Sequence, residues 1–144
     1  PLTSRLLALL HKIDILPAEL VLVQAANESA WGTSRFARKG YNFFGIWCFV
    51  KGCGFVPGKR NAGATHEVAK FPSLSRATYT YMRNLNRHDA YTDLREIRER
   101  LRANQIPITG VALAEGLMNY SERGAAYVDE LQTMIRFNQE FLTE

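Results

Sequence analysis

The chain has 144 residues, of which 47% are hydrophobic and 22% are charged, with a formal net charge of +4. This composition is close to the average of soluble globular proteins, and it excludes a disordered or collagen-like chain. No apolar run approaches the roughly 20 residues that a membrane-spanning helix requires, so we expect no membrane insertion of this domain. The modest charge, without a recognisable binding motif, also argues against nucleic acid as the partner.

The first forty residues predict helices. A short first helix is expected to be capped by Thr3 or Ser4 and to end at Leu10. Pro17 suits the first position of a second helix, because its missing N–H has no partner there anyway. This second helix, over residues 18–28, is apolar almost all round, which predicts that it lies in the middle of the domain. Residues 34–39 predict one or two further helical turns.

The segment from Gly45 to Phe71 has a different character. It contains several glycines, both cysteines and many β-branched or aromatic residues, a mixture typical of hairpins and loops. We expect strands near Ile46–Val50, Cys53–Val56 and Thr65–Phe71, with a mobile loop over Pro57–Ala64.

The two cysteines, Cys48 and Cys53, flank a Lys51-Gly52 pair that is typical of a turn. A hairpin turn here brings the two side chains within disulfide reach, although two buried free thiols are the alternative. A disulfide favours an oxidising compartment, the periplasm or cell envelope. Two thiols cannot complete a zinc site, and the three histidines are scattered, so we expect no metal.

Helices are predicted to resume after this segment. The expected helices and their capping residues are Leu74–Asn86 after Ser73, Ala90–Asn104 after Asp89, Gly110–Tyr120 after Thr109, and Ala125–Leu142. Two helical blocks around one small β-rich insertion predict a single α+β, mostly α domain over residues 1–144.

The segment from Arg76 to Arg102 contains seven arginines and four acidic residues. This pattern is typical of a solvated helical face. The alternative is a groove for an anionic polymer, either nucleic acid or a cell wall with acidic peptide stems. A nucleic-acid binder is distinguished by steep salt dependence.

Glu28 is the first candidate for chemistry. It ends the apolar helix and shares a face with Val21, Gln24 and Ala25 by helical spacing. Loss of water and the partial negative charge at a helix C-terminus are both expected to raise its pKa. A glycosidase general acid requires such a carboxyl group. The structural alternative is a helix-end glutamate that reaches solvent.

Two motifs around Glu28 carry a family resemblance. The first reads Glu-Ser-Ala-Trp-Gly-Thr-Ser over residues 28–34, and the second reads Asn-Phe-Phe-Gly-Ile-Trp over residues 42–47. In order and spacing they resemble the glucosaminidase family of peptidoglycan hydrolases, more closely its Bax-like branch. The resemblance covers roughly Pro17 to Leu142. It implies a lysozyme-like fold with a small β-hairpin lobe, cleavage after N-acetylglucosamine, no cofactor, and Glu28 as the catalytic acid.

The resemblance also implies two further catalytic candidates. The family's second glutamate follows a threonine in the β-lobe, and Glu67 offers a match here. Its structural alternative is an exposed strand residue paired with His66 or Lys70. A Tyr-Ala-Thr-Asp-x-x-Tyr pattern near the C-terminus matches Tyr120 and Tyr127, with one extra residue between them. Tyr120 is expected to orient the substrate's acetamido group or a water.

Five residues are candidates for binding the glycan, and most have a structural alternative. These residues are Ser29, Asn42, Phe44, Trp47 and Tyr127. Asn42 can instead hold a turn through hydrogen bonds to the backbone. Phe44 and Tyr127 can instead be core residues, and Trp47 is either a core residue or a platform on which a sugar stacks.

These observations predict an endo-β-N-acetylglucosaminidase that acts on the peptidoglycan glycan strand as a monomer, without cofactor or metal, in the periplasm or cell envelope. A lytic transglycosylase is the alternative within enzymes, since that reaction needs one carboxylate and releases anhydro-muramic ends. A binding module that kept the groove and lost turnover is the alternative outside enzymes.

Overall fold

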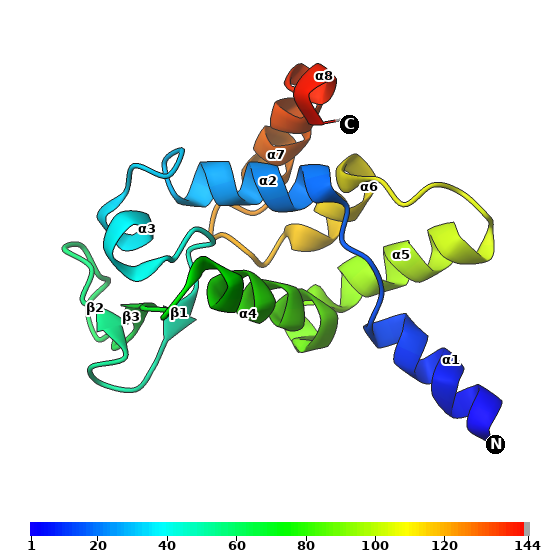
Figure 1. Cartoon of the computed structure of the whole chain (residues 1–144), viewed down its shortest axis with the longest axis horizontal. Helices are drawn as coiled ribbons and strands as arrows, with labels where there is room; N and C mark the ends of the chain where they lie inside the picture. Colours follow the sequence, from blue (N-terminus) through cyan, green and yellow to red (C-terminus); the bar gives the residue numbers. More distant parts are fainter. Residues whose placement is uncertain (143–144) are drawn as a thin grey trace. The chain divides into compact units, whose positions relative to one another are not determined.

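The computed structural model describes residues 1–142, and its fold is α+β and mostly α, as predicted for a lysozyme-like domain (Figure 1). The chain divides into two compact units. Residues Gln24–Tyr81 form one, called the lobe unit below, and Pro1–Val23 with Met82–Glu144 form the other, called the helical unit. The boundaries fall inside α2 (Ala18–Glu28) and α4 (Leu74–Arg87). The single catalytic domain over residues 1–144 stays a prediction.

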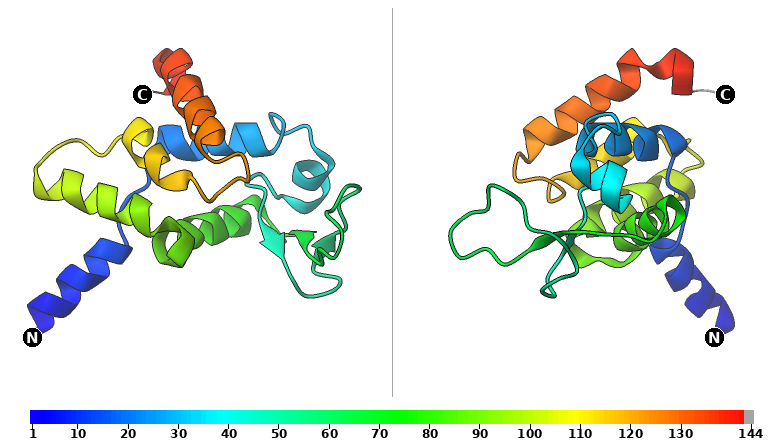
Figure 2. Two further views of the ribbon diagram at one scale, coloured as in Figure 1. Left: turned by 180° about the vertical axis from the view of Figure 1, so that it is seen from behind. Right: turned by 60° about the vertical axis from the view of Figure 1, so that its left-hand side comes forward.

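The helical unit contains most of the helices. Besides parts of α2 and α4, its elements are α1 (Leu2–Lys12), η1 (Asp89–Tyr91), α5 (Thr92–Ala103), α6 (Gly110–Ala114), η2 (Glu115–Leu117), α7 (Ala125–Phe137) and α8 (Gln139–Leu142). Helix α6 packs against α5 and α7 (Figure 2). The side chains of Leu94, Leu113 and Leu131 are fully buried in its core. No helix among the described residues is long and apolar enough to cross a membrane.

The helices after α4 are shorter than predicted. Ser73 and Thr109 cap their helices as expected. The predicted helix 110–120 instead ends at residue 114 and continues as the tighter η2. There Gly116 comes so close to α5 that a Cβ on it would lie 2.3 Å from the Leu94 Cα. The predicted helix 90–104 is also divided, because η1 comes first and is capped by the His88 ring rather than by Asp89.

The lobe unit contains α3 (Arg35–Gly40) and a small antiparallel sheet. Its strands are β1 (Trp47–Cys48), β2 (Gly54–Phe55) and β3 (Glu67–Ala69), in the order β1-β3-β2. All three strands were predicted, and all are shorter than expected. The central strand β3 is buried along its length. At Gly54 a Cβ would lie 1.9 Å from the Val68 carbonyl oxygen, so only glycine allows the β2–β3 contact.

The disulfide predicted between Cys48 and Cys53 is confirmed. It closes the turn that leads from β1 to β2, which we call the disulfide turn (residues 48–54). The Cys53 amide also donates a hydrogen bond of 3.0 Å to the Val50 carbonyl. Covalent and hydrogen-bonded closure together fix this turn.

Helix α2 is buried on one side only. Leu20, Val23 and Gln24 are buried, as predicted, but Leu22 is 53% exposed. The prediction that the helix lies in the middle of the domain therefore holds for one face only, because an apolar sequence does not require every face to be covered. Pro17 stands one residue before the helix, where its carbonyl accepts hydrogen bonds from the amides of residues 20 and 21.

The arginine-rich segment is not a uniformly solvated face. Arg95 is 5% exposed and Arg98 is 1% exposed. The Arg98 guanidinium donates to the Lys12, Asp14 and Ile15 carbonyls and to the Asn86 side chain. The predicted solvation is wrong for these two residues, because an arginine has five N–H donors and can satisfy several buried carbonyls at once. Here Arg98 fixes the end of α1 and the residues that follow it.

Candidate active site

Glu28 is the last residue of α2 and is half-buried. The backbone of Gly45 lies directly against its carboxylate, because a Cβ at residue 45 would be 2.5 Å from Glu28 Oε2. Gly45 also has a φ of +66°, a left-handed conformation that favours glycine. The glycine of the second motif therefore positions the glutamate of the first. Sequence analysis gave Gly45 no role, although its place in the motif was the available signal.

The chain turns sharply after Glu28. Ala30, Trp31 and Gly32 all have positive φ, and the Ser29 hydroxyl accepts a hydrogen bond of 2.7 Å from the Gly32 amide. Trp31 is 70% exposed, so its side chain does not pack into the core. Ser29 is itself buried and organises the turn, and its predicted role in substrate binding stays a prediction.

Asn42 is a buried organiser of the loop that carries Gly45. Its amide nitrogen donates to the Ile46 and Ala69 carbonyls, and its side-chain oxygen accepts from the amides of Phe44 and Ile46. These four hydrogen bonds use both N–H donors and both lone pairs of the side-chain amide. The structure thus gives Asn42 the turn-holding role that was its alternative to binding substrate.

The two aromatic candidates of this loop differ in exposure. Phe44 is 2% exposed and stacks on the Tyr81 ring at 4.2 Å, so it is a core residue. Trp47 is 48% exposed and stacks on the His66 ring, with 3.6 Å between centroids and 10° between planes. Trp47 therefore presents a supported aromatic surface, as a sugar platform requires. Sequence analysis did not find the His66 contact, because it depends on the register of β1 with β3.

Glu67 begins β3 and is 6% exposed. Its two carboxylate oxygens accept hydrogen bonds from the backbone amides of Gly52 at 3.0 Å and Gly54 at 2.9 Å. These bonds, first from Gly52 and then from Gly54, hold the Glu67 pKa below its ordinary value of 4.5. The structural alternative, an exposed glutamate paired with His66 or Lys70, is wrong, since Glu67 is buried and its partner is the backbone of the disulfide turn.

A potential ligand cluster lies at the same place. One ligand atom from each of Cys48, Cys53 and Glu67 lies within 4.8 Å of the others. The two sulfur atoms are joined in a disulfide. Zinc binds thiolates, so the cluster does not offer a zinc ligand set in this oxidised form.

The two tyrosine candidates lie in the helical unit. The Tyr120 and Tyr127 rings stack at 5.8 Å with an interplanar angle of 7°, and Tyr91 lies 5.8 Å from Tyr120 in a tilted contact. Tyr127 is 1% exposed and is packed as its alternative predicted, whereas Tyr120 is half-buried. Sequence analysis missed Tyr91. The lobe unit holds the remaining candidates: Glu28, Ser29, Asn42, Phe44, Trp47 and Glu67.

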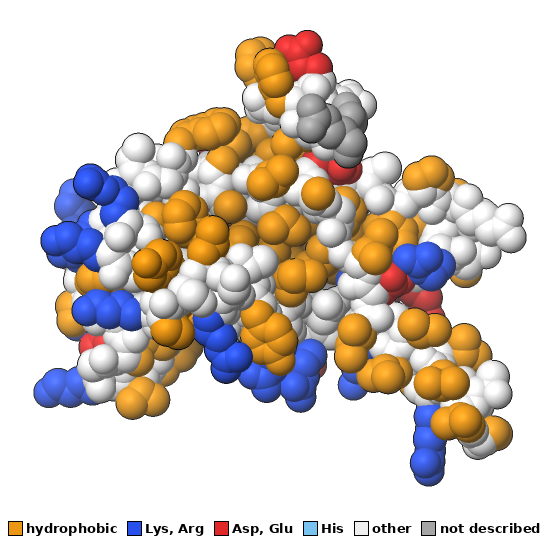
Figure 3. Space-filling view, viewed as in Figure 1, with side chains coloured by type: hydrophobic (Ala, Val, Ile, Leu, Met, Phe, Trp, Pro, Cys, Tyr) orange, Lys and Arg blue, Asp and Glu red, His pale blue; other side chains and the backbone are white. Residues whose placement is uncertain are grey.

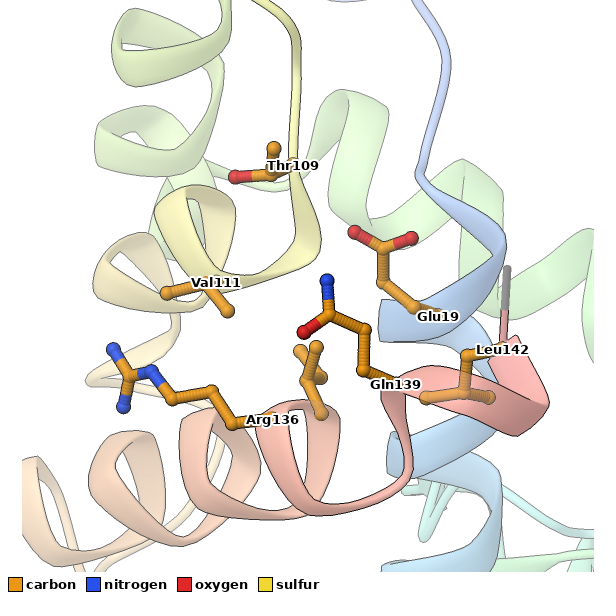
Figure 4. A pocket seen from close by; sticks show the side chains of 7 residues that line it. Glu19, Thr109, Val111, Arg136, Gln139 and Leu142 are labelled. Carbon is orange, nitrogen blue, oxygen red and sulfur yellow. The ribbon is translucent and has the colours of Figure 1, made fainter.

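A separate cavity of about 190 Å³ lies within the helical unit and contains none of the predicted site residues (Figure 4). Its lining residues are Glu19, Thr109, Val111, Ile135, Arg136, Gln139 and Leu142. Ligand pockets usually measure about 300–1,000 Å³, so this cavity is small for one. The carboxylate of Glu19 is already engaged, because it accepts a hydrogen bond of 2.7 Å from the Gly110 amide.

Comparison with known proteins agrees with the family resemblance that the motifs around Glu28 carry. Residues 4–140 match the family model Glucosaminidase, described as mannosyl-glycoprotein endo-β-N-acetylglucosaminidase. The chain belongs to the glucosaminidase family. This glucosaminidase chain is 36% identical over 134 residues to Protein bax of Escherichia coli (strain K12), covering 93% of the chain and 47% of the relative. It thus spans about half the length of that protein. No solved structure matches.

Proposed function

We propose that the chain is a peptidoglycan hydrolase, an endo-β-N-acetylglucosaminidase that cleaves the glycan strand with Glu28 as general acid. The observation that carries the proposal is the packing of the Glu28 carboxylate against the bare backbone of Gly45. Family membership supports a glycan substrate and glycoside hydrolysis. Contact with the Gly45 backbone restricts the position of the Glu28 carboxyl group, and proton transfer requires a donor in a fixed position.

The chemistry is a proton transfer followed by an attack on the anomeric carbon. Protonated Glu28 gives its proton to the glycosidic oxygen as the bond to the anomeric carbon breaks. The substrate's own acetamido oxygen bonds to that carbon, as it does in substrate-assisted glycosidases. Water then attacks the same carbon, the bond between that carbon and the acetamido oxygen breaks, and the Glu28 carboxylate takes a proton from the water. The acid is regenerated, and one glycosidic bond has been hydrolysed.

One observation favours this route over one with Glu67 as base or nucleophile. Both oxygens of Glu67 accept backbone hydrogen bonds. In an attack by Glu67, these bonds would have to break as the carboxylate forms a new one. Tyr120 is then the group that orients the acetamido oxygen in our proposal.

A lytic transglycosylase is the second candidate. It also needs a single carboxylate, so the engagement of Glu67 favours it as much as substrate-assisted hydrolysis. In that reaction an internal hydroxyl of the sugar, rather than water, attacks the anomeric carbon, and the product is an anhydro-muramic end.

Mass spectrometry of digested peptidoglycan tests the proposal. We expect products with reducing N-acetylglucosamine ends from the wild-type chain and none above background from Glu28→Gln. Anhydro-muramic ends would establish the transglycosylase instead. Intact peptidoglycan after long incubation with correctly folded protein would overturn both and favour a binding module.

We also propose that the chain acts in the periplasm or cell envelope. The Cys48–Cys53 disulfide supports this, because disulfides persist in oxidising compartments. Alkylation of freshly isolated, denatured protein tests it by intact mass. No alkyl adduct is expected, and two adducts would remove the argument.

A further inference from the structure

Charge is divided unevenly between the two units. The lobe unit carries eight lysines and arginines against two glutamates, a formal charge of +6, whereas the helical unit carries ten against twelve. The modest net charge of +4 hides this division. A surface potential of one sign attracts molecules of the opposite sign, so the lobe unit is the place to seek an anionic partner.

The basic residues of the lobe unit lie at its surface. Every one of its eight basic side chains is exposed: Arg35, Arg38, Lys39, Lys51, Lys59, Arg60, Lys70 and Arg76. Figure 3 shows such side chains over α3 and the strands. The salt bridges found among residues 1–142 all lie in the helical unit. The carboxylate of Glu67 is engaged by the backbone amides of Gly52 and Gly54.

Two of these cations are gathered on one aromatic ring. The Arg35 guanidinium lies 5.4 Å and the Lys70 ammonium 4.4 Å from the centre of the Phe55 ring. Gly40 permits this arrangement, because a Cβ there would lie 2.6 Å from the Phe55 ring and 3.3 Å from Lys70 Cγ. We call Arg35, Phe55 and Lys70 the cation cluster. An aromatic face attracts each cation and leaves its positive charge in place for an anion that approaches.

Helix stability does not explain the position of Arg35. It is the first residue of α3, where the partial positive charge of a helix N-terminus disfavours a cation. Arg38 and Lys39, in contrast, lie in the last turn, where the same dipole favours them. What holds Arg35 in place is aromatic contact, since its guanidinium lies 5.2 Å from the centre of the Phe36 ring and 5.4 Å from that of Phe55.

We propose that the cation cluster, with the basic surface around it, binds free carboxylates on the peptide stems of the glycan strand. This inference rests on the proposed function, because a glycan cleaved at N-acetylglucosamine has no charge on the reacting sugar itself. The carboxylates of the stems supply one. Binding them holds the strand on the lobe unit and makes the enzyme selective for strands with acidic stems.

The test compares two forms of one substrate. Purified peptidoglycan is used as isolated and after its carboxylates have been converted to amides by carbodiimide coupling, which leaves the glycan unchanged. For the wild-type chain we expect KM to rise roughly three- to tenfold on the amidated form, with kcat unchanged, since two exposed ion pairs are lost. An unchanged KM would overturn the proposal.

The matched variants are Arg35→Gln/Lys70→Gln and the control Arg87→Gln/Arg100→Gln. The control removes the same charge from exposed arginines of the helical unit. We expect the first pair to raise KM on native peptidoglycan as much as amidation does. On the amidated form, the KM of this variant should equal that of the wild type. An equal rise in the control would show that net charge alone matters and would overturn the cluster.

Binding measured by co-sedimentation with peptidoglycan separates this inference from the proposed function. If neither substrate is cleaved but amidation and the first variant pair weaken binding equally, the proposed function fails and the carboxylate site stands. Competition with duplex DNA and with anionic lipid vesicles checks the other anions. Release of the wild-type chain from peptidoglycan by DNA or vesicles at lower anion concentration than by acidic stem peptides would overturn the proposal.

Discussion

The end of α2 and the disulfide turn each hold one glutamate, and the two carboxylates have opposite surroundings. Glu28 lies against the backbone of Gly45, where a Cβ would lie 2.5 Å from Glu28 Oε2. Glu67 lies against two backbone amides that occupy both of its oxygens. Two backbone amide donors stabilise the ionised form of a carboxyl group, so the surroundings of Glu67 suit a permanent anion. The comparison gives Glu67 an architectural role, whereas the chemistry of Glu28 is our proposal, although both lie in the lobe unit.

Glu28→Gln provides the largest expected effect. The amide cannot donate the leaving-group proton, so the rate of peptidoglycan cleavage should fall on the order of 10²–10⁴-fold. The melting temperature should stay near that of the wild type, because Gln has almost the same shape. Activity within a few-fold of wild type at unchanged melting temperature would contradict the role of Glu28 and remove the contrast with Glu67.

Gly45→Ala tests the surroundings of Glu28 rather than its chemistry. The new Cβ would lie 2.5 Å from Glu28 Oε2, so the carboxylate must move. A displacement of about 1 Å can cost on the order of 10²-fold in rate, and we expect kcat to fall by about that much.

Gly63→Ala is the matched control for this prediction. Gly63 has a φ of +81° and no atom within 4 Å of a built Cβ, so it shares the backbone strain but not the contact with Glu28. Both variants should lose stability, but only Gly45→Ala should lose most of its kcat. Similar kcat values in the two variants would show that Gly45 serves the turn alone.

The sequence predicted the local parts of this arrangement better than the long-range ones. The end of α2 at Glu28, the cap at Thr109 and the disulfide were correct, since each depends on residues close together in the chain. The partner of Glu67 was missed, because Gly52 and Gly54 reach it only through the pairing of β3 with its neighbours.

Burial of charged residues was the other limit of the sequence. In the sequence, nothing distinguishes Arg95 and Arg98 from the exposed arginines nearby. They are buried because carbonyls at the ends of other elements need donors, which only the tertiary structure reveals. In the same way, Phe55 gathers Arg35 and Lys70 from segments that are 35 residues apart.

Tyr120→Phe is expected to have an intermediate effect. The variant keeps the ring that contacts Tyr91 and Tyr127, so the chain should still fold. If the hydroxyl orients the acetamido group, kcat should fall by about tenfold, the scale of one lost hydrogen bond. Tyr91→Phe is the control, since it removes a hydroxyl from the same cluster. Equal losses in both variants would assign the effect to packing rather than to Tyr120.

Glu67→Gln should have the smallest effect on catalysis and a measurable one on stability. An amide presents one acceptor oxygen and one N–H group, so one of the Gly52 and Gly54 amides loses its acceptor. We expect kcat at about pH 7 to stay within a few-fold of wild type and above that of Tyr120→Phe, with a lower melting temperature. A loss as large as that of Glu28→Gln would make Glu67 a catalytic base or nucleophile.

The pH dependence of stability separates this structural role from a general loss of charge. The pKa of Glu67 in the folded chain lies below its ordinary 4.5, so the folded state favours the ionised form. Its contribution to stability is complete above that value and is lost as the pH falls through the lower folded pKa. The melting-temperature gap between wild type and Glu67→Gln should therefore be widest near neutral pH and should close in acid.

Glu122→Gln, which removes the same charge from an exposed position, should show no such closing gap. A gap that stays constant down to about pH 3 would mean that Glu67 acts through shape alone, and not as the anion that its two amide partners require.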